Sequence, residues 1–319
     1  MPLRRLALAL SAAFALFAPS VARGQRWIAR ADSLFRQGRV FAAETLYYYA
    51  TRRAPRDPAA RLALGRYLAA RGALKVGAVL MEEAAYFGGD RKVVATYLAP
   101  VYARLGNYKA LASLPGSPLP YAQRARAEWL AANAPATSGP DSATVPLGAA
   151  DSASLGSITI AIGDERLQAR VDPRAQGLVL DTAWLGASGV RRFASTYDND
   201  WRNAVGVVHT LGIGDLMLAN VPVAFAAAGG RGAARIGLDA LAELAPTIDR
   251  GAGTMTLRRS GHVPDARPGA RIPTLSYPGG IWLIQRDGLW PLGGTNAGLV
   301  LGMGPWTINP RRGEIILGP

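Results

Sequence analysis

A period of 34 residues runs through the first third of the chain. Glycines stand at three positions with this spacing, Gly38, Gly72 and Gly106. Small residues recur with the same period at a second position, occupied by Ala31, Gly65 and Ala99. Small side chains at fixed points let two helices pack closely, and glycine suits the turn between them. The period therefore predicts stacked pairs of helices over residues 27–114.

This repeat resembles the tetratricopeptide family. Trp27 stands at the family's tryptophan position, and Leu64-Gly65 stands at its Leu-Gly position. A single unit cannot bury its apolar face alone, so about three units must stack. Residues 120–133 have apolar side chains at helical spacing and are expected to supply the closing helix. The helical domain is thus predicted to span residues 25–133.

Stacked helix pairs of this family form a concave groove, which implies a peptide or a protein as partner. The alternative is that the helices are only a packed scaffold for the rest of the chain. Tyr47 falls on a packing position of the repeat and is expected to be buried, whereas Tyr48 and Tyr49 are candidates for exposed positions.

Residues 1–24 have the pattern of an export signal. Arg4 and Arg5 precede the apolar core Leu6–Phe17, and Ser20-Val21-Ala22 is a small-residue cleavage site. This apolar run is too short for a stable membrane span, and no other stretch approaches about 18 apolar residues. We expect a periplasmic or secreted protein with no stable membrane span after signal removal. A retained N-terminal anchor is the alternative.

Composition excludes several kinds of chemistry. The chain has no cysteine, so disulfides, a thiol nucleophile and thiolate metal sites are ruled out. Its net charge of +14 comes mainly from arginines that are scattered without a dense basic run. We interpret this as a bias in composition and expect no nucleic-acid partner. His209 and His262 are the only histidines and lack zinc-site spacing, so no metal or cofactor is expected.

Residues 134–154 are rich in Ala, Pro, Ser and Thr, which predicts a flexible linker. Beyond it, short apolar segments alternate with glycine turns, as in residues 158–162 and 167–171 around Gly163-Asp164. This pattern predicts a closed or sandwiched β fold over residues 155–260, interrupted by one short helix near residues 239–244.

Asp181 ends one of these apolar strands, Leu178-Val179-Leu180. A carboxylate at the mouth of a buried strand is unfavourable unless it is paired, hydrogen-bonded or functional. Its segment, G-L-V-L-D-T-A-W-L-G-A-S-G-V, resembles the active-site strand and turn of aspartic proteases, which read apolar residues and then Asp-Thr-Gly-Ala-Ser. Asp181 and Thr182 match that pattern.

Two further segments resemble retropepsin-like domains of this class. Residues 235–258 contain I-G-L-D and a T-I-D hairpin typical of their closing segment, and residues 211–225 resemble their Asn-Val-Pro-Val hairpin. The resemblance implies an acid-protease-like barrel, with Asp181 as catalytic carboxylate and Thr182 tying its turn. The whole chain is then multidomain: an all-α tetratricopeptide-repeat array followed by an all-β barrel with one short helix.

Aspartic proteolysis requires two carboxylates that share one proton around a water molecule. One lobe supplies one aspartate, so the resemblance implies either a homodimer or a second carboxylate within the chain. Asp287 is the only candidate for the latter, because L-I-Q-R-D-G-L-W loosely resembles the segment around Asp181. A surface turn is the alternative for Asp287. Asp239 in I-G-L-D is interpreted as a helix cap or turn residue.

The active-site pattern also departs from the family. Ala183 stands where the family has glycine and would add a methyl group at a crowded point, while Trp184-Leu185 lengthen the loop. Two functions therefore remain open. One is an aspartic endopeptidase that uses Asp181, and the other is a catalytically inactive protease-fold module for binding or assembly.

Residues 261–319 repeat part of this domain in shortened form. Leu301-Gly302-Met303-Gly304, Thr307-Ile308-Asn309 and the segment 313–317 follow the pattern of residues 236–257. This tail is either a reduced second lobe or an edge hairpin that covers the first lobe. Because it is too short for a full lobe, we favour the edge role.

Overall fold

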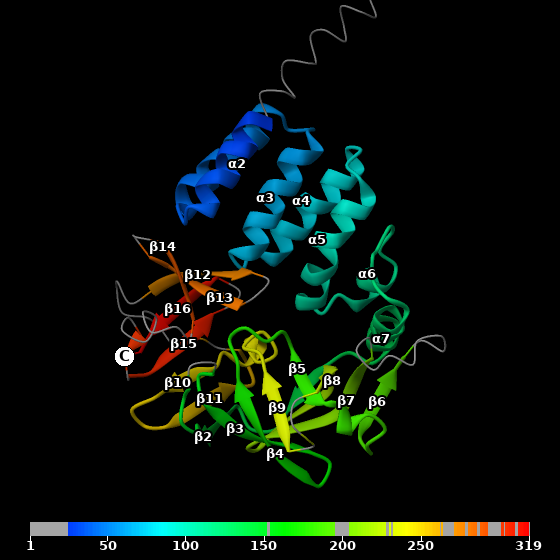
Figure 1. The fold of residues 1–319 in the computed structure, drawn as a ribbon, viewed down its shortest axis with the longest axis vertical. Coiled ribbons are helices and arrows are strands. Elements are labelled where there is room, and N and C mark those ends of the chain that lie inside the picture. The colour runs from blue at the N-terminus through cyan, green and yellow to red at the C-terminus, as the bar shows by residue number, and fades with distance from the viewer. Residues whose placement is uncertain are drawn as a thin grey trace, which may run out of the picture. The chain divides into compact units, whose positions relative to one another are not determined.

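The structure is a computed structural model, which describes residues 25–151, 154–194, 204–227, 230, 232–261, 263, 271–277, 280–285, 288–292, 301–302, 304–309 and 312–318. The expected export signal lies outside these residues. The chain divides into two compact units, which we call the helical unit and the β unit (Figure 1). Of the described residues, the helical unit comprises 25–101, 115–117 and 288, and the β unit comprises the others.

Paired helices build the helical unit. Residues 25–36 are helical, and α2 (Val40–Arg53), α3 (Pro58–Ala70), α4 (Leu74–Tyr86) and α5 (Arg91–Arg104) follow. The last residues of α5 already belong to the β unit. Gly38, Gly72 and Gly106 have φ angles of 75°, 90° and 66°. These left-handed values favour glycine, and they confirm the three turns that the period predicted.

The helices approach one another most closely at a second set of small residues. A Cβ atom placed on Gly65 of α3 would lie 2.9 Å from the carbonyl oxygen of Gly77 on α4. Ala31 and Ala99, at the equivalent repeat positions, are buried. The small residues that the period singled out are therefore the ones that permit close packing. Among the described residues, no helix is both long and apolar enough to cross a membrane.

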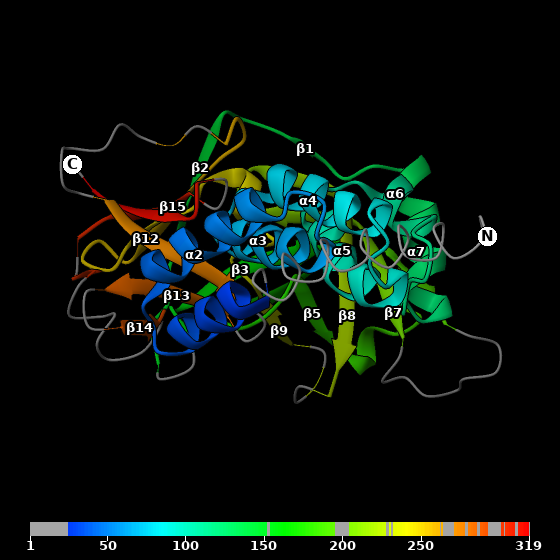
Figure 2. The same cartoon turned by 90° about the horizontal axis from the view of Figure 1, so that it is seen from above.

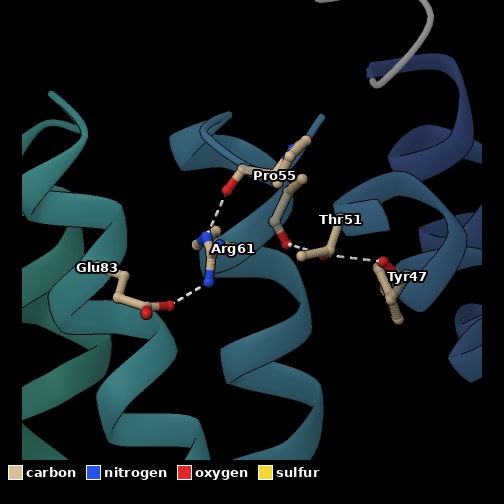
Figure 3. Close-up of polar contacts among 6 residues, drawn as sticks. Tyr47, Thr51, Pro55, Arg61 and Glu83 are labelled. Atoms are coloured by element: carbon tan, nitrogen blue, oxygen red, sulfur yellow. Dashed lines mark hydrogen bonds and ion pairs between the residues drawn. The ribbon is translucent and has the colours of Figure 1, made fainter. Parts of the chain in front are cut away.

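Polar contacts join the neighbouring helices α2, α3 and α4 (Figure 3). Thr51 on α2 donates its hydroxyl to the carbonyl of Ala60 on α3, at 3.3 Å. Arg61 on α3 donates from Nε to the carbonyl of Pro55, at 2.6 Å, and pairs through Nη1 with Glu83 on α4. One arginine thus ties the turn before α3 to the following helix.

Tyrosines add a second group of contacts in this unit. Tyr47 is buried as predicted, and its hydroxyl donates to Asp32 at 2.5 Å. Tyr48 is exposed, whereas Tyr49 packs its ring on Trp27 with a centroid distance of 4.7 Å. Of the two candidates for exposed positions, Tyr48 is therefore exposed, and Tyr49 contributes to packing instead.

We predict that Gly65→Val destabilises the helical unit by about 1–3 kcal/mol, because the added side chain meets backbone that is held by the neighbouring helix. Urea denaturation followed by far-ultraviolet circular dichroism measures the change. Ala63→Val is the control, since Ala63 lies on the same helix and is only half-buried. Equal effects of the two substitutions would contradict the close approach of α3 and α4.

The first sheet of the β unit contains a closed ring. Its strand order is β1-β8-β5-β9-β4-β3-β7-β6, and β7 also pairs with β8, which closes six of these strands on themselves. The strands are β1 (Ala136–Ser138), β3 (Ser157–Ile162), β4 (Glu165–Val171), β5 (Leu178–Asp181), β6 (Val190–Phe193), β7 (Val205–Ile213), β8 (Leu216–Ala226) and β9 (Ala233–Ile236). The closed β fold expected from the short strands and glycine turns is present.

The second sheet combines strands from both ends of the β unit, in the order β14-β13-β12-β16-β15-β10-β11-β2. They are β2 (Ser142–Pro146), β10 (Thr247–Asp249), β11 (Thr254–Arg258), β12 (Arg271–Tyr277), β13 (Gly280–Gln285), β14 (Gly288–Pro291), β15 (Trp306–Asn309) and β16 (Glu314–Leu317). Trp306 and Ile315 are fully buried in the same core as Ile248 and Met255. The described part of the tail thus extends the sheet of β10 and β11 and does not form a lobe with its own core.

The segment expected to be a flexible linker is instead ordered in strands. β1 pairs with β8, and β2 pairs with β11 in a register that places Val145 opposite Met255. The segment forms a strand because buried apolar residues alternate with exposed ones, a pattern that its overall composition does not reveal. Ala143, Val145 and Leu147 point inward and are buried, while the residues between them are exposed.

The expected closing helix of the repeat array also lies elsewhere. α6 (Tyr108–Ala112) and α7 (Tyr121–Ala132) belong to the β unit, where α7 contacts β6 and β7. Arg126 of α7 donates to the carbonyl of Val223 at 3.0 Å, and Trp129 packs on Phe193. The helical domain predicted over residues 25–133 therefore ends earlier, because the apolar face of α7 is buried on a sheet.

We predict that Val145→Asp lowers the stability of the β unit by more than about 2 kcal/mol, because it places an unpaired carboxylate in the core. Ser142→Asp on the exposed face of the same strand is the control and should change stability little. Thermal melting monitored by circular dichroism distinguishes the two. A flexible linker would tolerate both substitutions equally.

Candidate functional site

Asp181 occupies the last position of β5, a strand that is bonded on both sides. β5 runs parallel to β8 and antiparallel to β9, and the three strands lie side by side (Figure 2). Leu178 and Leu180 point into the core and are almost fully buried. Pairing on both sides holds β5 in register with its neighbours as far as Asp181. The prediction that Asp181 ends a buried strand is confirmed.

Backbone N–H groups satisfy the Asp181 carboxylate. The N–H of Ala183 donates to Oδ1 at 2.8 Å, and the N–H of Gly230 donates to Oδ2 at 3.1 Å. Asp181 is 5% exposed. Its side chain also caps the short 3-10 helix η1 (Thr182–Trp184) that follows β5. The described geometry is thus that of a carboxylate that joins its own turn to the loop after β8.

Trp184 anchors the turn that follows Asp181. Its side chain is 1% exposed and belongs to the core of the β unit, whereas Ala183 is exposed. Leu185 N–H donates to the carbonyl of half-buried Thr182 at 3.0 Å, which closes the turn. Within the described residues, Ala183 is therefore not crowded, and the crowding predicted beside a second carboxylate stays a prediction. The large apolar surface of Trp184 was the sequence signal for this outcome.

Asp239 lies in a turn, as its interpretation predicted, and fixes the residue that precedes β5. Its Oδ1 and Oδ2 accept from the N–H of Gly177 at 2.9 and 3.0 Å, and Oδ1 also accepts from Ala240 N–H. Gly237 leaves room for this contact, since a Cβ there would lie 2.4 Å from Asp239 Oδ1. η3 (Ala242–Leu244), a three-residue 3-10 helix, follows where the short helix was expected.

Burial of its carboxyl group raises the pKa of Asp239, although the residue as a whole keeps an exposed side. The two N–H groups and the charge of Arg104, at the end of α5, oppose this increase. Burial likewise lowers the pKa of Arg104. An acid whose pKa is higher in the folded chain weakens folding as the pH rises through its titration range.

The remaining sequence candidates do not join Asp181 in the described structure. Asp287, the candidate second carboxylate, and His262 lie outside the described residues. His209 is exposed on β7 and contacts Trp129 edge to face, at a ring distance of 5.9 Å. Within the described ranges, no group of three or more His, Asp or Glu side chains could hold a metal ion.

No family model matches this sequence, and no curated protein matches it. Two solved structures are similar to parts of the chain. One is YrrB, a TPR protein with an unusual peptide-binding site, at 22% identity over 34% of this chain and 51% of that one, with a TM-score of 0.26. The other is a retropepsin-like aspartic protease from Rickettsia conorii, at 14% identity over 39% of this chain and 92% of that one, with a TM-score of 0.26. This chain thus spans about half the length of YrrB.

We predict that Asp239→Ala destabilises the β unit by about 1–2 kcal/mol, because Gly177 N–H loses its acceptor. Asp239→Asn should destabilise the β unit less than Asp239→Ala at neutral pH. The amide keeps an acceptor oxygen, and it removes the negative charge that burial disfavours, as the raised pKa of Asp239 indicates. Urea denaturation at neutral pH measures both variants. Glu128→Ala, an exposed change on α7, is the control, and an Asp239→Ala variant as stable as this control would contradict the role.

Proposed function

We propose that this chain is an exported, two-part binding protein with a catalytically inactive protease-like fold. Its helical unit takes a peptide or protein partner, and its β unit is a module for binding or assembly. The observation that carries the proposal is the state of Asp181, whose two carboxylate oxygens each accept a backbone N–H group within the chain.

The chemistry of aspartic proteolysis explains why this observation matters. The reaction needs a carboxylate that orients a water molecule and shares a proton with a second carboxylate. Asp181 is 5% exposed, and Oδ2 faces the N–H of Gly230. A carboxylate in this position is suited to holding the loop after β8, and it is poorly placed to receive a water molecule and a peptide bond.

Surface properties of the helical unit support a macromolecular partner. Phe41 and Tyr48 on α2, and Val76, Val79 and Tyr86 on α4, are large apolar side chains that remain exposed. Exposed apolar side chains that gather into a patch are typical of interaction surfaces, whereas single ones are common on any protein. Basic residues outnumber acidic ones about two to one over residues 25–101, so a partner segment with acidic character would be favoured.

An aspartic endopeptidase is the second candidate function. It is favoured by the position of Asp181-Thr182 at the end of a buried strand and by the bond from Ala183 N–H, two residues further along the chain, to Oδ1. This function requires a second carboxylate, supplied by Asp287 or by a second copy of the chain. It also requires Gly230 to release Oδ2.

We predict that the purified protein does not cleave a mixed peptide library at any pH from acidic to neutral, and that Asp181→Asn behaves alike. Mass spectrometry of the peptide products measures cleavage. Asp215→Asn, in an exposed turn of the same unit, is the control for unrelated effects of charge. Acid-dependent cleavage that is lost in Asp181→Asn and kept in Asp215→Asn would overturn the proposal and establish the endopeptidase.

A further inference from the structure

A cavity of about 320 Å³ lies in the β unit, where the chain beyond β2 meets the turn between β10 and β11. Leu147 and Leu155 line it with side chains that are buried in the core. The loop 148–150, Arg250 and Gly253 complete its wall. Its volume is at the lower end of the range of roughly 300–1,000 Å³ that small-molecule sites occupy.

Arg250 is the single charged residue among those that line this cavity. Its Nε is buried and has no hydrogen-bond partner in the part of the chain that the structure describes. The nearby acidic groups are engaged elsewhere, since Asp249 accepts from Ala252 N–H at 2.8 Å and Asp151 pairs with Arg170. A buried donor without an acceptor is unfavourable, and an anionic ligand would supply the missing acceptor.

The loop beside Arg250 offers further donors. Leu147 N–H and Gly148 N–H are used within the protein, donating to Gly253 and Ser157 at 2.8 Å each. Over the described ranges, the next two N–H groups, of Ala149 and Ala150, donate to no protein acceptor. The first two bonds hold the loop in place, and the exposed residues Ala149 and Ala150 line the same cavity as Arg250.

We propose that this cavity binds a small amphiphilic carboxylate. The apolar chain of the ligand lies against Leu147 and Leu155, and its carboxylate is held by the Arg250 guanidinium and the N–H groups of the loop 148–150. Charge-assisted bonds from a guanidinium are among the stronger polar contacts in proteins. A fatty acid and the C-terminal end of an apolar peptide share this chemistry.

Isothermal titration calorimetry of the full chain with octanoate and with octanol tests the proposal. Octanoate should bind, and octanol, which lacks the carboxylate, should bind at least tenfold more weakly. Arg250→Gln should weaken octanoate binding at least tenfold, whereas Arg166→Gln, an exposed arginine on β4, should not change it. Circular dichroism melting establishes that both variants are folded.

Ala150→Trp provides an independent variant, because a large side chain at this exposed lining position fills the cavity without altering a charge. It should abolish binding as Arg250→Gln does. A short apolar peptide with a free C-terminus, compared with its amide, shows whether a peptide end or a fatty acid is the better ligand.

The proposal is overturned if neither octanoate nor the free-carboxylate peptide binds. It is also overturned if octanol matches octanoate, or if folded Arg250→Gln or Ala150→Trp binds like the unmodified chain.

Discussion

The closure of six strands into a ring is the constraint on which the β unit depends. β7 and β8 pair along nearly their whole length, from Val205 opposite Ala224 to Ile213 opposite Leu216. Gly206 of β7 permits close approach on both sides, because a Cβ there would lie 2.8 Å from the carbonyl oxygen of Arg191 on β6 and 3.0 Å from the ring of Phe225 on β8. Every strand of the ring then has a bonded neighbour on each side, which removes free edges and fixes where each strand ends. The position of Asp181 is a consequence of that closure.

Local patterns in the sequence predicted the parts of this fold that depend on local physics. The 34-residue period predicts turns at Gly38 and Gly72, where a left-handed backbone favours glycine, and both residues have positive φ angles. Asp181 was placed at the end of a strand because apolar residues precede it, and Asp239 in a turn because of its short acceptor side chain. In each case the residue and its immediate neighbours contain the information.

Features that depend on distant partners could not be read in this way. The strand β2 was hidden in a segment rich in Ala, Pro, Ser and Thr, because its buried residues are defined by pairing with β11, more than a hundred residues away. The apolar face of α7 can pack on a helix or on a sheet, so the spacing of its apolar residues does not predict that it contacts β6 and β7. The bond from Gly230 to Asp181, which carries the proposed function, joins residues 49 positions apart.

β10 and β15 pair in the second sheet through two related segments. Thr247 in T-I-D and Thr307 in T-I-N hold equivalent places in two related hairpins, and they lie opposite each other, with hydroxyl oxygens 2.6 Å apart. Equivalent residues that face each other across an antiparallel ladder lie on a local two-fold axis, as they would at an isologous contact between two copies of one chain. β15 thus covers the edge of β10 as a second copy of β10 would. The side of β10 that is not paired with β11 is therefore closed within the chain, and it is not free to pair with a strand of another molecule.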